Sequence, residues 1–232
     1  RLAPAFMLWE TNTKFKATIG TGFKAPSLYY LYDPAYGNEN LNPEESFGWD
    51  FGIEQYLFAQ NLSIGTTFFY NKFSDMFGFD YVTFKTINIK KAVTKGFEVY
   101  IEAKPIDELS LKANYTFTDA RDTSPDSPDF DKKLLRRPES KLGFYISYTF
   151  IPKANINAEV IWVGVREDVD FSTFQRTELK EYVLLNIAAH YDVFDFLRLN
   201  ARVENLLDTD YEEVFGYGTA GLSFYGGIKL IL

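Results

Sequence analysis

Apolar and polar residues alternate along eleven separate stretches of this chain, and this alternation constrains the fold more than any other feature. From residue 109 to 118, every odd-numbered residue is apolar or aromatic and every even-numbered residue is polar. A period of two residues is typical of a β-strand and differs from the period of a helix. The sequence therefore predicts eleven β-strands. The other ten stretches lie near residues 2–9, 14–21, 47–54, 61–73, 97–104, 141–150, 155–166, 179–192, 197–204 and 222–232.

The connections between these stretches alternate between short and long. The short ones lie near residues 10–13, 57–60, 105–108, 151–154 and 193–196. The long ones lie near residues 22–44, 74–94, 119–137, 167–178 and 207–221. A soluble β-sandwich has no reason to keep its long loops on one side. A membrane-spanning barrel has tight turns on one rim and long loops on the other. The sequence therefore predicts an all-β, antiparallel transmembrane barrel.

Three further features favour a barrel in a membrane over a soluble sheet. The stretches are about ten residues long, as a tilted strand needs to be to cross the apolar core of a bilayer. Aromatic residues such as Trp9, Tyr56 and Tyr191 lie near strand ends, where interfacial girdles form. Charged residues such as Glu98 and Arg198 lie on the polar face, which suits a hydrated or plugged lumen better than a packed core. We therefore expect the apolar faces to look outward into lipid.

Composition excludes several other classes of protein. The 232 residues are enough for one β domain, which we place at residues 1–232. No run approaches the roughly 18 apolar residues of a membrane helix. The net charge of −8 and the absence of a dense basic patch argue against nucleic acid as a partner. The chain has no cysteine, which excludes disulfides and thiolate metal sites.

Catalysis is not expected. His190 is the only histidine, and no Ser/His/Asp set can be assembled without it. A single histidine on a barrel wall is typical of a hydrogen-bonded wall residue. We therefore expect neither an enzyme nor a resident cofactor or metal.

An odd number of strands points to part of a larger barrel, because single-chain bacterial barrels have an even number. Two open edges in hydrocarbon would cost on the order of tens of kcal/mol in unpaired backbone groups. The chain begins inside a strand-like pattern and shows no signal peptide. We expect about half of a barrel, with the missing strands on the N-terminal side.

Four segments resemble the TonB-dependent outer-membrane receptors. They are Gly-Phe-Lys-Ala-Pro at residues 22–26, Asn-Leu-Asn-Pro-Glu at 40–44, Asn-Leu-Leu-Asp-x-x-Tyr at 205–211, and the ending at 225–232. The ending, with Gly227, Leu230 and Leu232, is similar to the family's barrel-assembly signal. Its last residue is Leu232, where the family usually has an aromatic residue.

This resemblance implies a fold and a function. The family's fold is a 22-stranded barrel around an N-terminal plug, so the eleven strands would be its C-terminal half. The plug and the segment bound by TonB would lie in the absent part. The expected function is import of a ferric siderophore or cobalamin across the bacterial outer membrane, driven through TonB. The expected partners are the TonB energy-coupling complex, the siderophore or cobalamin ligand, outer-membrane lipid and lipopolysaccharide, and the barrel-assembly machinery. Residues 216–221 resemble the last loop of vitamin B12 transporters and related siderophore receptors.

Aromatic side chains in the long loops are the candidate ligand contacts. They offer large, flat surfaces at low entropic cost, which suits a rigid chelate or corrin. Some of them could instead belong to the upper aromatic girdle. The candidates are Tyr29, Tyr30, Tyr32, Tyr36, Phe79, Tyr81, Phe174 and Tyr217, with Phe77 and Phe171 beside them.

Charged loop residues and rival functions leave alternatives open. The acidic residues of 119–131 could bind Ca²⁺, but two prolines interrupt them and the spacing of a calcium loop is missing, so a solvated loop is favoured. The basic residues of 132–137 could pair locally or contact lipopolysaccharide phosphates. The rival functions are a passive porin, a soluble all-β binding module and a barrel enzyme.

Overall fold

The computed structural model describes residues 1–80 and 83–230, and its regular secondary structure consists almost entirely of β-strands. The strands are β1 (Ala5–Leu8), β2 (Thr13–Lys24), β3 (Glu44–Leu57), β4 (Leu62–Asp80), β5 (Lys85–Ile106), β6 (Leu109–Asp122), β7 (Ser140–Ile151), β8 (Ala154–Val163), β9 (Arg166–Asp170), β10 (Gln175–Leu179), β11 (Tyr182–Phe194), β12 (Leu197–Glu204) and β13 (Ser223–Leu230). The helices are α1 (Leu28–Tyr32) and a 3₁₀ turn (Phe58–Gln60). Neither of these described helices is long and apolar enough to cross a bilayer.

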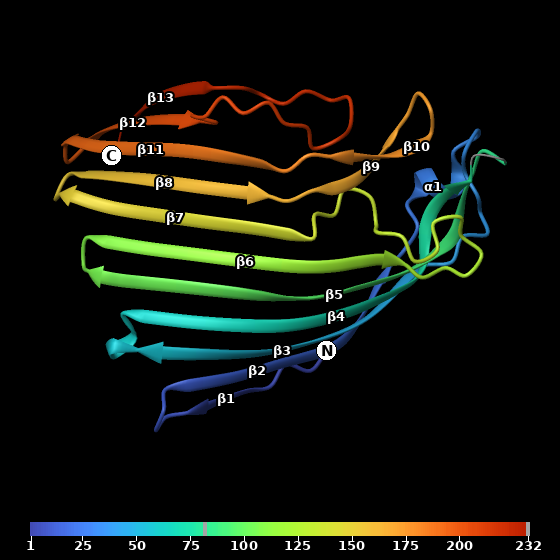
Figure 1. The fold of residues 1–232 in the computed structure, drawn as a ribbon, viewed down its shortest axis with the longest axis horizontal. Coiled ribbons are helices and arrows are strands. Elements are labelled where there is room, and N and C mark those ends of the chain that lie inside the picture. The colour runs from blue at the N-terminus through green and yellow to red at the C-terminus, as the bar shows by residue number, and fades with distance from the viewer. Residues whose placement is uncertain (81–82, 231–232) are drawn as a thin grey trace.

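Eleven of the described strands form one antiparallel sheet, in the order β1 to β8 and then β11, β12 and β13 (Figure 1). The strands β9 and β10 pair with each other as a separate hairpin between β8 and β11. Within the described residues, β1 and β13 are the two edges of the sheet and do not pair with each other. The predicted eleven-stranded antiparallel sheet is therefore confirmed, and it is open.

The pairing register keeps one face of the sheet apolar from strand to strand. Phe51, Phe68, Phe97 and Phe117 stand opposite one another on β3, β4, β5 and β6. The ring centroids of Phe68 and Phe97 are 6.2 Å apart, and those of Phe97 and Phe117 are 5.7 Å apart. Because side chains alternate between faces, a slip of one residue would move such a row to the polar side. The row therefore fixes the register of these four strands.

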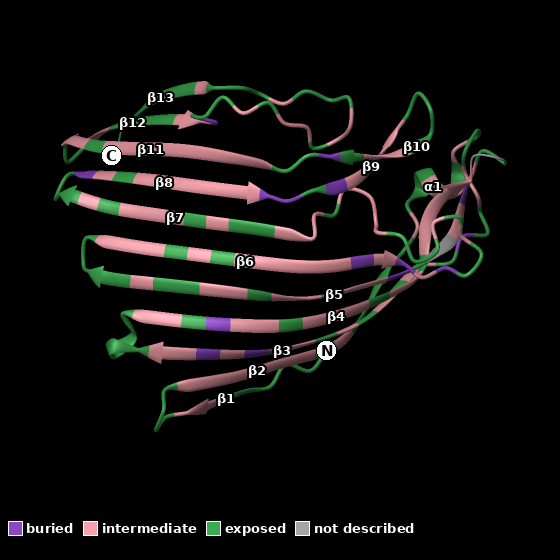
Figure 2. Cartoon of the chain, viewed as in Figure 1, coloured by how far each residue is buried: buried purple, intermediate pink, exposed green. Residues whose placement is uncertain are grey.

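The apolar face does not pack against a second layer. Leu142, Phe144 and Leu199 remain 41%, 38% and 42% exposed, and most strand positions are intermediate or exposed (Figure 2). A soluble sandwich would bury such side chains between two sheets. The apolar side chains therefore look outward, as predicted. The buried apolar residues among those described are Leu41, Ala92, Ala120, Ala154, Val163 and Leu179.

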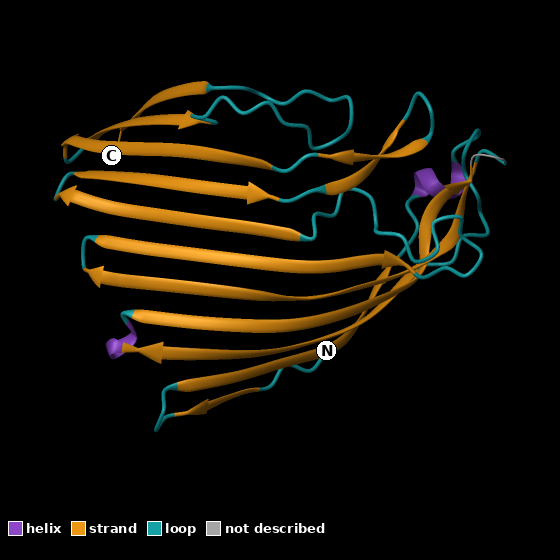
Figure 3. Ribbon diagram, viewed as in Figure 1, coloured by secondary structure: helices purple, strands orange, loops and turns teal. Residues whose placement is uncertain are grey.

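The two ends of the sheet differ in the way that the alternation of connections predicts. The five tight turns, at residues 9–12, 58–61, 107–108, 152–153 and 195–196, lie at one end, and the long loops and α1 lie at the other (Figure 3). Gly227 and Leu230 of the predicted assembly signal lie in β13, opposite Asn200 and Leu197 of β12. Leu232 lies outside the described residues.

The predicted long loop at residues 74–94 is wrong, because β4 continues to Asp80 and β5 begins at Lys85. The pairing between these strands shifts register between Phe73 and Phe77, and Asp75 has a φ of 54°. Such a β-bulge inserts an unpaired residue and changes which residues face each side. The alternation in the sequence is therefore interrupted although the strand continues. The predicted loop at 167–178 likewise contains the β9–β10 hairpin.

Candidate ligand-binding site at the long-loop rim

The first long loop is shaped by two capping residues. Ser27 begins α1, and its hydroxyl oxygen accepts a hydrogen bond from the Tyr30 N–H at 3.2 Å. Asp33 ends the helix, and its carboxylate accepts from the N–H groups of Ala35 at 2.9 Å and Tyr36 at 2.8 Å. Asp and Ser favour such local bonds over continued helix. The result is a compact loop that holds the tyrosines of α1 and Tyr36 close together.

This loop is fastened to the upper part of β5. The Thr86 N–H donates to the Tyr36 carbonyl at 2.9 Å, and the Asn38 side chain donates to the Thr86 carbonyl at 3.0 Å. The Asn88 side chain accepts from the Asn42 N–H at 2.7 Å and donates to the Asn42 carbonyl at 2.9 Å. These bonds satisfy backbone groups that an unpaired strand edge would expose. They also place the loop beside the β4–β5 hairpin.

An aromatic cleft of about 440 Å³ lies between the loop and the hairpin. The Tyr30 and Phe77 rings meet edge to face with their centroids 5.4 Å apart. The Tyr36 and Phe79 rings do the same, with their centroids 5.7 Å apart. Its volume is in the range of small-molecule sites, and three phenol hydroxyls supply polar groups. The cleft can therefore accept a flat ligand surface and hydrogen-bond its edge. It is lined by Tyr29, Tyr30, Tyr36, Phe77, Gly78, Phe79 and Thr86.

An ion pair supports the base of the cleft. The Lys24 ammonium lies 2.9 Å from the Glu44 carboxylate and 5.2 Å from the centre of the Phe77 ring. The Glu44 carboxylate also accepts a hydrogen bond from the Phe77 N–H at 2.8 Å. Lys24, the last residue of β2, and Glu44, the first residue of β3, therefore hold Phe77 in place beside the bulge of β4.

The structure brings together half of the predicted ligand residues. Tyr29, Tyr30, Tyr36 and Phe79 line the cleft, with Phe77 between them. Tyr32 lies on α1 but is not among the residues that line the cleft, and it is 60% exposed. Phe174 and Tyr217 lie on two other loops and are each 67% exposed. Tyr81 lies outside the described residues.

Two lining residues, Gly78 and Thr86, escaped the sequence analysis. They lie in the range that was predicted to be a loop, so their strand positions were hidden. The alternation of Thr86 and Asn88 with Ile87 is the signal that could have located the strand that carries Thr86. A ligand role for all the residues of the cleft stays a prediction.

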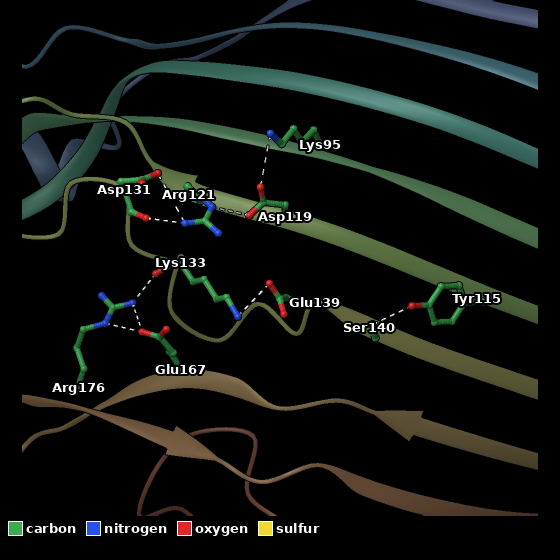
Figure 4. Close-up of polar contacts among 10 residues, drawn as sticks. All are labelled: Lys95, Tyr115, Asp119, Arg121, Asp131, Lys133, Glu139, Ser140, Glu167 and Arg176. Carbon is green, nitrogen blue, oxygen red and sulfur yellow. Dashed lines mark hydrogen bonds and ion pairs between the residues drawn. The ribbon is translucent and has the colours of Figure 1, made fainter.

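The charged residues of 119–137 pair with one another and with neighbouring loops (Figure 4). Arg121 lies 2.8 Å from the Asp119 carboxylate and 3.6 Å from that of Asp131. Lys133 lies 2.9 Å from Glu139, and Arg136 pairs with Asp168 at 2.9 Å. Local pairing is therefore what this basic cluster shows. No group of three or more potential metal-ligating side chains converges among the described residues.

The Asp168 carboxylate is completely buried on the hairpin β9–β10. Burial by itself raises the pKa of this group. The N–H groups of Phe215 and Val169 and the Arg136 guanidinium outweigh that effect and hold the pKa below its usual value. Asp168 is therefore a buried, ionised acceptor for three donors.

Charges on the polar face of the sheet are also paired. The Glu54 carboxylate lies 3.2 Å from the Lys14 ammonium and 2.6 Å from that of Lys16. Three further charged residues of this face pair within the wall: Glu102 with Lys112 at 3.0 Å, Arg198 with Asp192 at 2.5 Å, and Arg202 with Glu204 at 3.2 Å. The wall therefore neutralises these charges itself.

Residues 3–206 match the family model described as "TonB dependent receptor-like, beta-barrel". The chain is similar over 98% of its length to the ferripyoverdine receptor of the outer membrane of Pseudomonas aeruginosa (20% identity, TM-score 0.76, 32% of that chain). The chain is also similar to the ferric-catecholate import receptor Fiu from E. coli K12, with 16% identity and a TM-score of 0.77, covering 98% of this chain and 34% of that one. It is likewise similar to the copper transporter OprC, with 17% identity and a TM-score of 0.81, covering 98% of this chain and 37% of that one.

At these identities the solved structures show the fold. This chain spans about a third of their length. The family model covers most of the chain and agrees with the open, outward-apolar sheet and its two unlike rims. The chain belongs to the TonB-dependent receptors, as part of their outer-membrane β-barrel.

Proposed function

We propose that the protein imports a ferric siderophore across the outer membrane and that the aromatic cleft makes its first contact with the ligand. Membership of a receptor family and a preformed cleft at the long-loop rim support this proposal. The rings of Tyr30, Tyr36, Phe77 and Phe79 offer the flat contact surface that a rigid chelate needs. Cobalamin is the second candidate, because residues 216–221 resemble the last loop of vitamin B12 transporters.

The remaining partners follow from the family and belong to the same proposal. The energy for import comes from the TonB complex, which acts through a part of the receptor outside this chain. The apolar face contacts outer-membrane lipid and lipopolysaccharide, and the barrel-assembly machinery binds the segment at residues 225–232. A passive porin is disfavoured, because the receptors of this family are gated importers.

Uptake by living cells tests the proposal. The intact receptor is expressed in a strain that lacks its other iron and cobalamin receptors, and cells are supplied with radiolabelled iron on catecholate, hydroxamate and pyoverdine siderophores, or with labelled cyanocobalamin. We expect saturable uptake of one class, which stops when TonB is deleted. TonB-independent passage of many small solutes would instead identify a porin.

The role of the cleft is tested by removing two of its rings. Each stacked ring contributes roughly 1 kcal/mol, so Tyr30→Ala with Tyr36→Ala should weaken the apparent affinity for the imported ligand about tenfold or more. Phe58→Ala is the matched control, because Phe58 is a 77% exposed aromatic residue at the tight-turn rim. Equal affinities in the double variant and the control would refute the cleft as the binding site.

A further inference from the structure

The β9–β10 hairpin stands outside the main sheet, yet its base is among the most buried parts of the described chain. Its two strands pair only with each other, and a two-stranded hairpin is at best marginally stable in water. Nevertheless Arg166 is 5% exposed, Asp168 is fully buried and Leu179 is 3% exposed. Contacts with neighbouring loops must therefore hold the hairpin in place.

One carboxylate makes the central contacts. The Oδ1 atom of Asp168 accepts hydrogen bonds from the Arg136 Nε at 2.9 Å and from the Val169 N–H at 2.8 Å. Its Oδ2 atom accepts from the Phe215 N–H at 2.8 Å. Arg136 lies in the loop at residues 123–139, and Phe215 lies in the loop at residues 205–222. Asp168 therefore joins three loops that are far apart in the sequence.

Further bonds fasten each side of the hairpin. Towards the loop at 123–139, the Arg136 N–H donates to the Glu167 carbonyl at 2.7 Å. Arg176 lies 2.6 Å from the Glu167 carboxylate and 3.1 Å from that of Asp129, and it donates to the Lys133 carbonyl (Figure 4). Towards the loop at 205–222, Arg166 donates to the Glu212 carbonyl. The hairpin is thus held from both sides.

The tip of the hairpin is exposed, whereas its base is buried. Phe171 is 51% exposed and Phe174 is 67% exposed, while the Asp170 carboxylate accepts short-range bonds from the N–H and hydroxyl of Ser172. The Phe171 ring lies 5.7 Å from the guanidinium carbon of Arg136. The tip is therefore an aromatic projection whose position depends on the base.

We propose that Asp168 is a positioning residue that clamps these three loops into one rigid unit and holds the aromatic tip in a fixed place at the outer rim. The clamp itself stands on the contacts above. Its consequence for ligand capture rests on the proposed function: Phe171 and Phe174 form a second aromatic contact, on a different loop from the cleft.

Hydrogen exchange of the intact receptor in detergent micelles tests the clamp without any ligand. Asp168→Asn keeps the shape of the side chain and removes its charge. We expect exchange at residues 123–139, 166–179 and 205–222 to accelerate together, by about tenfold or more. Asp170→Asn, two residues further along the same hairpin and at its tip, is the matched control and should accelerate exchange only at the tip. Acceleration confined to the hairpin in Asp168→Asn would refute the clamp.

A second variant covers the case in which Asp168→Asn fails to assemble. Arg136→Gln leaves both backbone donors of Asp168 in place, and we expect it to loosen the loop at 123–139 about tenfold while the loop at 205–222 changes less. Unchanged exchange at 123–139 would also refute the clamp. Spin labels at Ser172→Cys and Thr219→Cys give a further readout: their distance distribution should be narrow and should broaden in Asp168→Asn, whereas equal widths would contradict a fixed tip.

The role of Asp168 in ligand capture is measured separately, by uptake of the radiolabelled ferric siderophores. Asp168→Asn should weaken the apparent affinity several-fold and leave the maximal rate unchanged, because positioning affects capture and not energised passage. A lower maximal rate at unchanged affinity would overturn this role. If no siderophore is imported by the unmodified receptor, the proposed function fails while the exchange result still decides the clamp.

Discussion

At the scale of single residues, the burial of a charged side chain decides how much its ion pair contributes to the stability of the fold. The side chain of Glu54 is 9% exposed and meets Lys14, Lys16 and the Tyr56 hydroxyl, the last at 2.8 Å. The Glu102–Lys112 pair on the same face has side chains that are 50% and 52% exposed. Water screens the exposed pair, whereas loss of the enclosed carboxylate leaves two ammonium groups and a phenol with fewer partners.

We therefore expect Glu54→Gln to lower the free energy of unfolding by about 1–3 kcal/mol. Glu102→Gln, the matched control, should change it by less than about 1 kcal/mol. Denaturant unfolding of the intact receptor in micelles, followed by the shift in electrophoretic mobility of the folded barrel, measures both. Equal losses for the two variants would contradict the importance of enclosure.

The pKa of Asp168 gives the rim a dependence on pH. Because burial is outweighed by the donors of Phe215, Val169 and Arg136, the pKa of this carboxyl lies below its usual value. A lowered pKa in the folded state means that its contribution to stability is complete above the ordinary aspartate pKa. The contribution declines as the pH falls below that value and is lost once the pH passes through the lowered pKa.

We therefore expect the loop at 205–222 to remain protected at neutral pH and to open only under strongly acidic conditions. Hydrogen exchange at the Phe215 amide, corrected for the intrinsic effect of pH, measures this opening. The Asp168→Asn variant should have lost the pH dependence. An opening that begins near neutral pH in the unmodified receptor would argue against Asp168 as its cause.

At the scale of elements, the β4–β5 hairpin shows what the sequence could and could not predict. The alternation located the membrane parts of both strands. It missed their extensions, since the bulge near Asp75 changes the phase of the pattern. The aromatic character of Tyr30 and Phe77 marked them as candidates, but their contact joins residues far apart in sequence. Only the bulge and the first loop together place these rings side by side.

The Asn88 side chain should be necessary for this arrangement, because it bonds both backbone groups of Asn42. We expect Asn88→Ala to loosen the loop at 25–43 and to raise its rate of cleavage by external chymotrypsin several-fold. Asn155→Ala is the control, since the Asn155 amide bonds the hydroxyls of Ser147 and Thr149 on the barrel wall. Equal cleavage in the two variants would contradict a role for Asn88 in holding the loop.

At the scale of the whole molecule, the main feature is the direction in which the apolar face of the sheet points. The sequence predicted this face correctly, because apolar and polar residues alternate along strands such as β6 and β12. It could not predict the pairing between loops, since Arg136, Asp168 and Phe215 belong to segments without any period. The contacts that shape the rim depend on three-dimensional proximity, which local patterns do not encode.

Adjacent residues on β5 test the two faces directly. Val99 lies on the apolar face opposite Thr66 and Tyr115, and Glu98 lies on the polar face opposite Thr67 and Thr116. We expect Val99→Arg to destabilise the folded barrel by roughly 2–4 kcal/mol in a lipid bilayer, as is typical for arginine facing lipid near the midplane. Glu98→Arg should cost less than about 1 kcal/mol. The folded fraction in lipid vesicles measures both, and the reverse order would mean that the faces are assigned wrongly.

The chain directions of the two edge strands restrict how the sheet can be closed into a barrel. Since all neighbours in the sheet are antiparallel and β1 and β13 occupy its first and eleventh places, these two strands run in the same direction. Rolling the sheet onto itself, or joining it to an identical copy with the same orientation, would create seams between strands that point the same way. Only an odd number of additional strands restores strict alternation around the circumference.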